Sequence, residues 1–225
     1  MLTSLDSGKA LCSPEAVTFR PEKTVCISGH REKSVVPYMN DPNNLHITRS
    51  AVKMMLYRYI DMALEKGYTD FISGLAEGTD LWAAEYILMK KEQDPELRLI
   101  GAMPFLRHSR FFHRNEKALL HRVEKGADQL ILINSDPNAV YSKNGANSGL
   151  YKNRNYFMVD NSSAVIAFFD ESNPRSGTGQ TVHYALRRGR IVRTFGLCDI
   201  YDIMDRTGCD FESLSDAIRA YENIF

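Results

Sequence analysis

The sequence lacks an excess of either charge. Its 225 residues include 28 basic and 28 acidic side chains, which gives a formal net charge of zero. A general nucleic-acid-binding protein would be strongly basic, so this balance excludes that electrostatic footprint and predicts at most weak DNA binding. A local basic patch is still compatible with it. Hydrophobic residues make up 44% of the chain and charged residues 25%, the usual mix of a globular domain.

Long apolar segments are also missing. No run approaches the roughly 18 residues that a membrane span requires, and the most apolar stretch, residues 164–169, has the length of a strand. The first residues carry Asp6, Lys9 and Glu15 and contain no apolar core. We therefore expect no secretory signal and no contact with a membrane.

Cysteine is scarce and unpaired in the sequence. The four cysteines, Cys12, Cys26, Cys198 and Cys209, form no C-x-x-C pair, which excludes the usual zinc and thioredoxin patterns. His108, His113 and His121 have spacings that spread them around a helix and do not align two as ligands. We expect no metal site, and a reduced, cytoplasmic protein.

What the chain does contain is an alternation of short apolar runs with helical patterns. Thr48 is the expected N-cap of the first helix, and Pro104 is expected to end the third strand. Residues 136–149 have no period and are expected to be a loop. The predicted strands are 24–28, 70–73, 98–103, 129–133, 164–169 and 190–195, and the predicted helices are 48–66, 79–91, 109–125, 150–160, 179–188 and 211–223.

Three joints between a helix and the next strand share one design, at residues 65–67, 124–126 and 187–189. In each joint a cation precedes a glycine. The cation suits the negative end of the helix dipole, and the glycine is expected to take a left-handed turn. Strands this apolar are buried on both faces, which is typical of parallel sheets. The predicted fold is α/β and Rossmann-like: a doubly wound, mostly parallel sheet flanked by helices. Residues 1–22 form an N-terminal arm and residues 23–225 a single domain.

Glycine-bearing loops follow three of the predicted strands, at the edge where open parallel sheets bind ligands. Glycine lets a backbone approach a ligand closely, arginine can bind a phosphate or carboxylate, and a helix N-terminus attracts anions. Gly29 alone also fits a simple turn, and Asp80 also fits a partner of the helix dipole. The candidate ligand-binding residues in these loops are Gly29, His30, Arg31, Gly74, Glu77, Gly78, Thr79, Asp80, Gly177, Thr178, Gly179 and Thr181.

Three loops on one edge favour a small phosphate-bearing ligand, although the third glycine of the dinucleotide fingerprint is missing. The amides near Gly179 are expected to face the phosphate. A basic cluster beside the third strand indicates a solvated surface, a clamp for phosphates or a weak contact with nucleic acid; its members are Arg107, Arg110, Arg114 and Lys117. The sequence contains no G-x-S-x-G motif, no P-loop and no Cys-His motif, so nothing supports a serine or cysteine nucleophile, and the catalytic residues are unknown.

The same loops carry a resemblance to a known family. Residues 28–31, 73–85, 154–162 and 176–185 resemble, in the same order, four motifs of the YpsA-like family. That family belongs to the SLOG superfamily, the Rossmann-like group that includes DprA and the LOG phosphoribohydrolases. The resemblance covers residues 23–197 and implies a site for a nucleotide, nucleotide derivative or nucleotide-sugar, and it identifies no cofactor. It adds Arg154, Asn155 and Asp160 to the candidate ligand-binding residues.

Three hypotheses on function follow. The first is a sensor or regulatory protein that binds a nucleotide or derivative. The second is a LOG-like enzyme that hydrolyses an N-glycosidic bond with Asp80, Glu77 or His183 as acid or base, although the catalytic Glu of the LOG motif has no counterpart here. The third is a DprA-like module that contacts nucleic acid or protein through residues 107–114. The sequence leaves homo-oligomerisation open.

Overall fold

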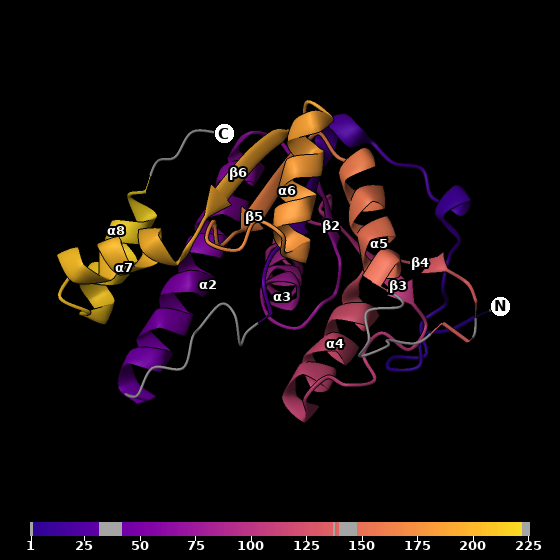
Figure 1. Cartoon of the computed structure of the whole chain (residues 1–225), viewed down its shortest axis with the longest axis horizontal. Helices are drawn as coiled ribbons and strands as arrows, with labels where there is room; N and C mark the ends of the chain where they lie inside the picture. The colour runs from indigo at the N-terminus through magenta and orange to yellow at the C-terminus, as the bar shows by residue number, and fades with distance from the viewer. Residues whose placement is uncertain (1, 32–41, 137, 140–147, 222–225) are drawn as a thin grey trace.

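The protein is a single parallel sheet between two layers of helices (Figure 1). The computed structural model describes residues 2–31, 42–136, 138–139 and 148–221. All strand pairs are parallel. The six strands lie in the order β4-β3-β2-β1-β5-β6 and are β1 (Thr24–Ser28), β2 (Asp70–Ser73), β3 (Arg98–Phe105), β4 (Gln129–Asn134), β5 (Ala164–Phe168) and β6 (Ile191–Phe195).

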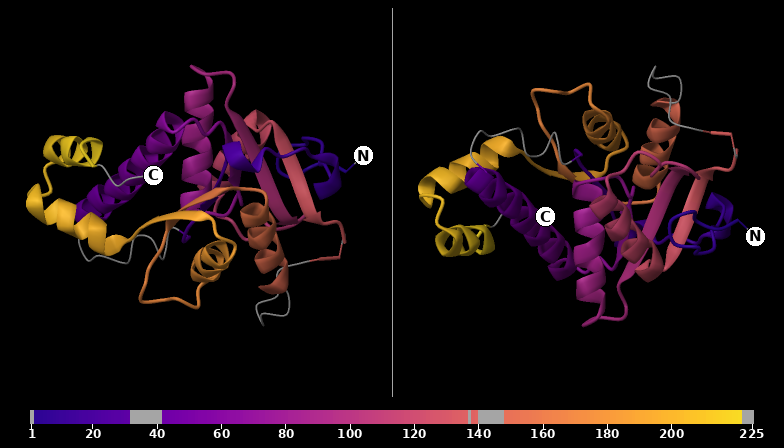
Figure 2. Two further views of the ribbon diagram at one scale, coloured as in Figure 1. Left: turned by 90° about the horizontal axis from the view of Figure 1, so that it is seen from above. Right: turned by 90° about the horizontal axis from the view of Figure 1, so that it is seen from below.

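The helices cover both faces of this sheet, as the two views of Figure 2 show. One layer holds α2, α3 and α4, and the other holds α5 and α6, while α7 and α8 pack on α2. No helix in the described ranges combines the length and apolar character that a membrane span requires. The helical elements are η1 (Pro14–Ala16), η2 (Pro21–Lys23), α2 (Pro42–Glu65), α3 (Thr79–Lys91), α4 (Arg114–Gly126), α5 (Ser148–Asp160), α6 (Gly177–Arg187), α7 (Leu197–Arg206) and α8 (Phe211–Arg219).

The strand order creates a switch point beside β1. The chain builds β2, β3 and β4 outward on one side of β1 and then returns to place β5 on the other side. Ile27 is in register with Ser73 of β2 and with Ile166 of β5, so the carboxyl ends of these strands lie level. Loops that follow them meet at one place, where doubly wound folds bind ligands. The predicted α/β, Rossmann-like fold is confirmed.

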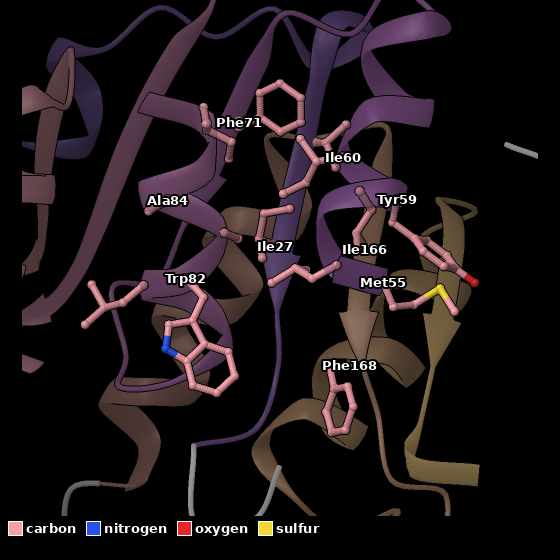
Figure 3. Packing of buried hydrophobic residues seen from close by; sticks show 14 of the residues in the cluster. Ile27, Met55, Tyr59, Ile60, Phe71, Trp82, Ala84, Ile166 and Phe168 are labelled. Carbon is pink, nitrogen blue, oxygen red and sulfur yellow. The ribbon is translucent and has the colours of Figure 1, made fainter. Parts of the chain in front are cut away.

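The larger core lies between the sheet and the layer of α2 and α3 (Figure 3). Apolar side chains of the central strands face the apolar stripes of both helices, because every strand of a parallel sheet is covered on both sides. Burial of these groups is the main force that holds the layers together. The residues that Figure 3 labels are Ile27, Met55, Tyr59, Ile60, Phe71, Trp82, Ala84, Ile166 and Phe168.

The N-terminal arm closes one edge of the sheet. The backbone N–H of Cys12 donates to the carbonyl of Leu130 at 2.8 Å, and the N–H of Leu132 donates to the carbonyl of Cys12 at 3.0 Å. Ser4 donates to the buried carboxyl of Glu124 on α4 at 2.5 Å. An edge strand left open would pair with other chains, so these contacts protect β4.

Several boundaries differ from the sequence prediction. Thr48 is not an N-cap: α2 begins at Pro42, and the Thr48 hydroxyl is buried against the sulfur of Met204. Helix α4 begins at Arg114, whereas the prediction started it at residue 109. Pro104 does not end β3, because beyond Gly101 the strand pairs only with β4 and its other edge needs no donor.

Two further predictions were wrong. Gly67 and Gly189 have φ of +81° and +67°, as expected for left-handed turns, but Gly126 has no positive φ and is the last residue of α4. A Cβ at Gly126 would lie 2.7 Å from Leu88, so close packing accounts for this glycine. Helix α7 was not predicted, and the last helix ends at Arg219. Most of the predicted loop at residues 136–149 lies outside the described residues.

We predict that all four cysteines are reduced and differ in reactivity, because Cys198 is exposed, Cys26 is buried and the other two are partly covered. A thiol reagent should label Cys198 first and Cys26 only on unfolding. Thiol counting of freshly prepared, denatured protein should therefore give four, the number of cysteines in the sequence. A count of two would show a disulfide and contradict the prediction.

Candidate functional site

A cavity of about 260 Å³ opens at the carboxyl ends of the central strands. It lies at the switch point beside β1, between the N-terminal parts of α5 and α6. Its wall brings together residues from all three predicted loops and from α5. The lining residues are Ser28, Gly29, His30, Arg31, Ala76, Asp80, Tyr151, Arg154, Asn155, Gly177 and Thr178.

The floor of the cavity holds a buried pair of opposite charges. Nη1 of Arg154 lies 3.5 Å from Oδ2 of Asp80, and each side chain is only 6% exposed. Burial raises the pKa of Asp80 to about 6, although the charge of Arg154 and the backbone N–H of Ala76 oppose the shift. Burial likewise lowers the pKa of Arg154. The carboxyl group of Asp80 therefore changes its protonation state close to neutral pH.

Arg154 is incompletely satisfied. Within the part of the chain that the structure describes, its Nε and Nη1 atoms are buried and have no hydrogen-bond partner. A buried donor without a partner costs about 1–3 kcal/mol, and a charged one costs more. Such groups are rare in native proteins, and this one lines a cavity. The guanidinium group therefore has hydrogen-bonding capacity that the described residues do not use.

Two glycines make room for this arrangement. A Cβ at Gly74 would lie 1.5 Å from Nη1 of Arg154, and a Cβ at Gly29 would lie 2.5 Å from the side chain of Thr79. Gly74 does not line the cavity. The guanidinium group packs directly against its Cα, and we call this contact the seat of Arg154. The loop from β2 to α3 also needs positive φ at Leu75 (55°) and at Gly78 (86°), and Gly78 is the N-cap of α3.

The loop after β1 is fixed by its polar groups. Thr79 donates from its hydroxyl to the carbonyl of His30 at 3.0 Å. Nε2 of His30 accepts a hydrogen bond from the N–H of Asp170 at 3.1 Å, and burial lowers the pKa of His30. His30 is therefore held as a neutral ring that connects β1 with β5. Arg31 is exposed at the cavity, where its charge can reach a ligand.

The start of α6 lies at the cavity. The helix begins at Gly177, and the Ser176 hydroxyl caps it by accepting from the N–H of Gly179 at 3.0 Å. The Gly179 amide is therefore used by the cap, and the expectation that a phosphate faces the amides at the start of this helix stays a prediction for its first residues. A Cβ at Gly179 would lie 2.3 Å from the carbonyl oxygen of Pro174, so this glycine serves close packing. Gly177 and Thr178 lie at the cavity.

Asn155 and Thr181 act together beneath that helix start. The amide of Asn155 donates to the Thr181 hydroxyl at 2.8 Å, and this hydroxyl donates to the carbonyl of Gly177 at 2.8 Å. Thr181 is 1% exposed and does not line the cavity. It connects α5 to the first turn of α6 through these hydrogen bonds.

Three other predicted residues lie elsewhere. Glu77 accepts from the N–H of His113 at 3.0 Å and so caps α4. Asp160 is at the far end of α5, where it accepts from Tyr184 at 3.0 Å and from Arg188 at 2.8 Å. His183 is exposed and bonded to the carbonyl of Gly179 at 2.7 Å. Of the three residues proposed as acid or base, only Asp80 lines the cavity.

Sequence reasoning missed two residues near the site. Tyr151 lines the cavity and packs edge-on against Phe105. His108 is 4% exposed, and burial together with the Arg154 charge lowers its pKa to about 4. Its position directly after β3, at the ligand-binding edge of the sheet, is the signal that could have found it.

The basic cluster lies in the turn after β3 and the first part of α4, outside the cavity lining. Arg107, Arg110, Arg114 and Lys117 are all exposed. Arg110 lies 5.4 Å from the ring centre of Phe111, a side chain that is 57% exposed. In the described ranges, no group of three or more His, Cys, Asp or Glu side chains could hold a metal ion.

Comparisons with known proteins find relatives of this chain in one family. The model of the YpsA family, described as the YspA SLOG family, matches residues 25–190. The uncharacterized SPbeta prophage-derived protein YoqJ of Bacillus subtilis (strain 168) is 31% identical over 120 residues, which cover 51% of this chain and 68% of YoqJ. A UPF0398 protein of Bacillus thuringiensis (strain Al Hakam) is 23% identical over 169 residues, covering 75% of this chain and 85% of the relative.

Among solved structures, DNA processing protein A (DprA) from Streptococcus pneumoniae is similar to this chain with a TM-score of 0.49 and 20% identity. The match covers 89% of this chain and 62% of the DprA chain, so this chain spans less than two thirds of that protein.

We predict that Gly74→Ala lowers the free energy of unfolding by about 1–3 kcal/mol, because its Cβ must displace the Arg154 guanidinium group from its seat. Urea unfolding measures this loss. Gly149→Ala is the matched control: Gly149 lies in α5 with nothing within 4 Å of its Cβ position. The control should change stability by no more than about 1 kcal/mol. Equal stability of the two variants would show that Gly74 does not seat Arg154.

Proposed function

The chain belongs to the YpsA family of SLOG proteins, because the family match extends over residues 25–190, and on this premise we propose that its cavity binds a nucleotide or nucleotide derivative. We propose a sensor or regulatory role, in which the bound ligand changes the state of the protein. The four free thiols support a reducing, cytoplasmic setting for this role.

The observation that carries the proposal is the unsatisfied guanidinium group of Arg154. Two of its nitrogen atoms, Nε and Nη1, are buried without a hydrogen-bond partner among the described residues, Nη1 has only the ion pair with Asp80 at 3.5 Å, and Arg154 is one of the residues that line the cavity. Apolar ligands would leave these donors unpaired, whereas a phosphate offers several acceptor oxygens. The ion pair with Asp80 recovers part of the free energy lost in burying Arg154, and an anionic acceptor would recover more of it.

The start of α6 supports the same chemistry. Helix α6 begins at Gly177, and both Gly177 and Thr178 line the cavity. The backbone N–H groups and the positive end of the dipole at a helix N-terminus favour an anion. Arg31 adds a second positive charge at the mouth. We infer that the phosphate of the ligand lies between Arg154, Arg31 and the first turn of α6. Tyr151 offers an aromatic face in the same cavity for the nucleoside part.

We predict that a matching nucleotide raises the melting temperature. At 100 times its dissociation constant it should stabilise the fold by about 2.7 kcal/mol, which for a chain of this size is a shift of about 5–10 °C. The thermal screen should include mono-, di- and cyclic nucleotides, NAD derivatives and sugar phosphates. If no compound shifts the melting of the unmutated protein, the cavity is not a nucleotide site.

Arg154→Gln should abolish this shift, measured against the variant's own melting temperature without ligand. The matched control is Arg219→Gln, since the Arg219 side chain is 79% exposed and belongs to α8, outside the cavity. The control should keep the full shift. A shift retained in Arg154→Gln would show that the guanidinium group does not hold the ligand.

A second candidate function is hydrolysis of an N-glycosidic bond, and the observation that favours it is Asp80. Burial raises the pKa of this carboxyl to about 6, and the group lines the cavity. A carboxyl with such a pKa can donate a proton to a departing base near neutral pH. The general-acid role requires the protonated form, so the rate should fall about tenfold per pH unit above pH 6.

Chromatography of nucleoside monophosphates incubated with the protein tests this second function. Enzymatic hydrolysis predicts free base from the unmutated protein and none above background from Asp80→Asn. The variant has nearly the same shape but holds its nitrogen-bound protons too tightly to transfer one. Binding of a nucleotide without release of free base would leave the regulatory role as the function.

A further inference from the structure

We propose that the buried pair of Asp80 and Arg154 couples anion binding to the uptake of one proton, so that the cavity binds anions more tightly as the pH falls. This inference rests on the proposed function, because it concerns the same cavity and assumes that an anionic group enters it. It adds a regulatory property, and it makes Asp80 the residue that decides when the site is ready to bind.

The geometry of the pair is the first argument. Asp80 and Arg154 face each other at 3.5 Å with side chains 6% exposed, so the carboxylate cancels the arginine charge where little water can screen either group. An anion that reaches Nε or Nη1 of Arg154 must also approach the carboxylate of Asp80, because Nη1 is the atom that forms the ion pair. The anion and the carboxylate carry like charges, and like charges close together in a buried site repel each other strongly. This repulsion disappears when the carboxyl group of Asp80 is protonated.

The second argument is hydrogen bonding. The ionised carboxylate of Asp80 is only an acceptor, and it accepts from the backbone N–H groups of Ala76, at 3.5 Å, and of Gly29. Once protonated, it gains a donor that can bond to an oxygen of the anion. One added proton therefore converts a repulsive neighbour into a partner, while Arg154 keeps its full charge for the ligand.

The surroundings of Asp80 identify it as the group that titrates. Arg154 faces it from α5, Arg31 from the segment after β1, and Cys26 from β1. Burial raises the pKa of the Cys26 thiol, which stays neutral. His108, on the turn after β3, faces Arg154, and its pKa of about 4 keeps it neutral as well.

His30 in the same lining has a pKa below its usual 6.5 because of burial, so its titration must be separated from that of Asp80 by a variant.

The direction of the effect follows from linkage. In the folded protein the pKa of Asp80 is raised from 3.8 to about 6, and a bound anion raises it further. Above pH 6 the free carboxyl is ionised and the bound one is protonated, so each anion takes up one proton. The dissociation constant then rises about tenfold per pH unit above pH 6 and is nearly constant below it.

Inorganic sulfate is a suitable probe, because its charge is constant over this range. We expect its dissociation constant for the unmutated protein, measured by titration calorimetry, to rise about 100-fold between pH 6 and pH 8. In Asp80→Asn it should stay constant, because the side-chain amide donates a hydrogen bond without taking up a proton. The same slope in both proteins would assign the effect to another group such as His30 and overturn the inference.

A measurement on the unmutated protein alone guards against misfolding of the variant. Calorimetry in two buffers with different ionisation enthalpies gives the number of protons taken up per sulfate, which should approach one at about pH 8. A value near zero would overturn the inference. If sulfate binds too weakly to measure, adenosine monophosphate replaces it. The phosphate of adenosine monophosphate itself titrates in this pH range, but it does so equally for both proteins. The quantity to compare is therefore the difference in dissociation constant between the unmutated protein and Asp80→Asn at each pH.

These outcomes differ from failure of the proposed function. If the affinity for a nucleotide changes with pH in the same way in the unmutated protein and in Asp80→Asn, proton coupling is refuted, but nucleotide binding still stands. If neither sulfate nor any nucleotide binds at any pH, both proposals fail together.

Discussion

The buried contact between Asp80 and Arg154 is the interaction on which the carboxyl edge of the sheet depends. It joins α3 to α5, which lie on opposite faces of the sheet, through the gap at the ends of β1 and β2. Burying two charges is expensive, and a pair held at 3.5 Å with free donors recovers only part of that free energy. The surrounding structure must therefore hold the pair in place. It does so through the seat at Gly74 and the well-packed strands below.

The fold could be predicted from the sequence because its signals are local and repeated. The bounds of β2 and α3 agree with the prediction, since apolar periodicity and the glycines around them mark both ends. The errors have tertiary causes. Thr48 looks like a cap but is covered by Met204, and Pro104 looks like a strand end but lies on an unpaired edge. The local sequence pattern shows neither that Met204 covers Thr48 nor that β2 stops pairing before Pro104.

The site was predicted less completely than the fold. Glycine loops and the rule for parallel sheets located the cavity and identified Gly29, Arg31 and Asp80 in its lining. Glu77 and Asp160 belong to the same motifs, but each serves a helix end or a neighbouring helix. The contact between Asp80 and Arg154 joins residues far apart in the sequence, and the shift in the pKa of Asp80 comes from burial. Both depend on how the helices pack, which a single sequence does not reveal.

The central claim is that the guanidinium group of Arg154 binds the phosphate of a nucleotide. A crystal structure of the protein with the nucleotide that stabilises it most tests this directly. The account predicts a phosphate oxygen at about 2.7–3.2 Å from Nε or Nη1 of Arg154, with the other phosphate oxygens toward the first turn of α6. A nucleotide bound in another place, with Nε and Nη1 still without a partner, would contradict the account.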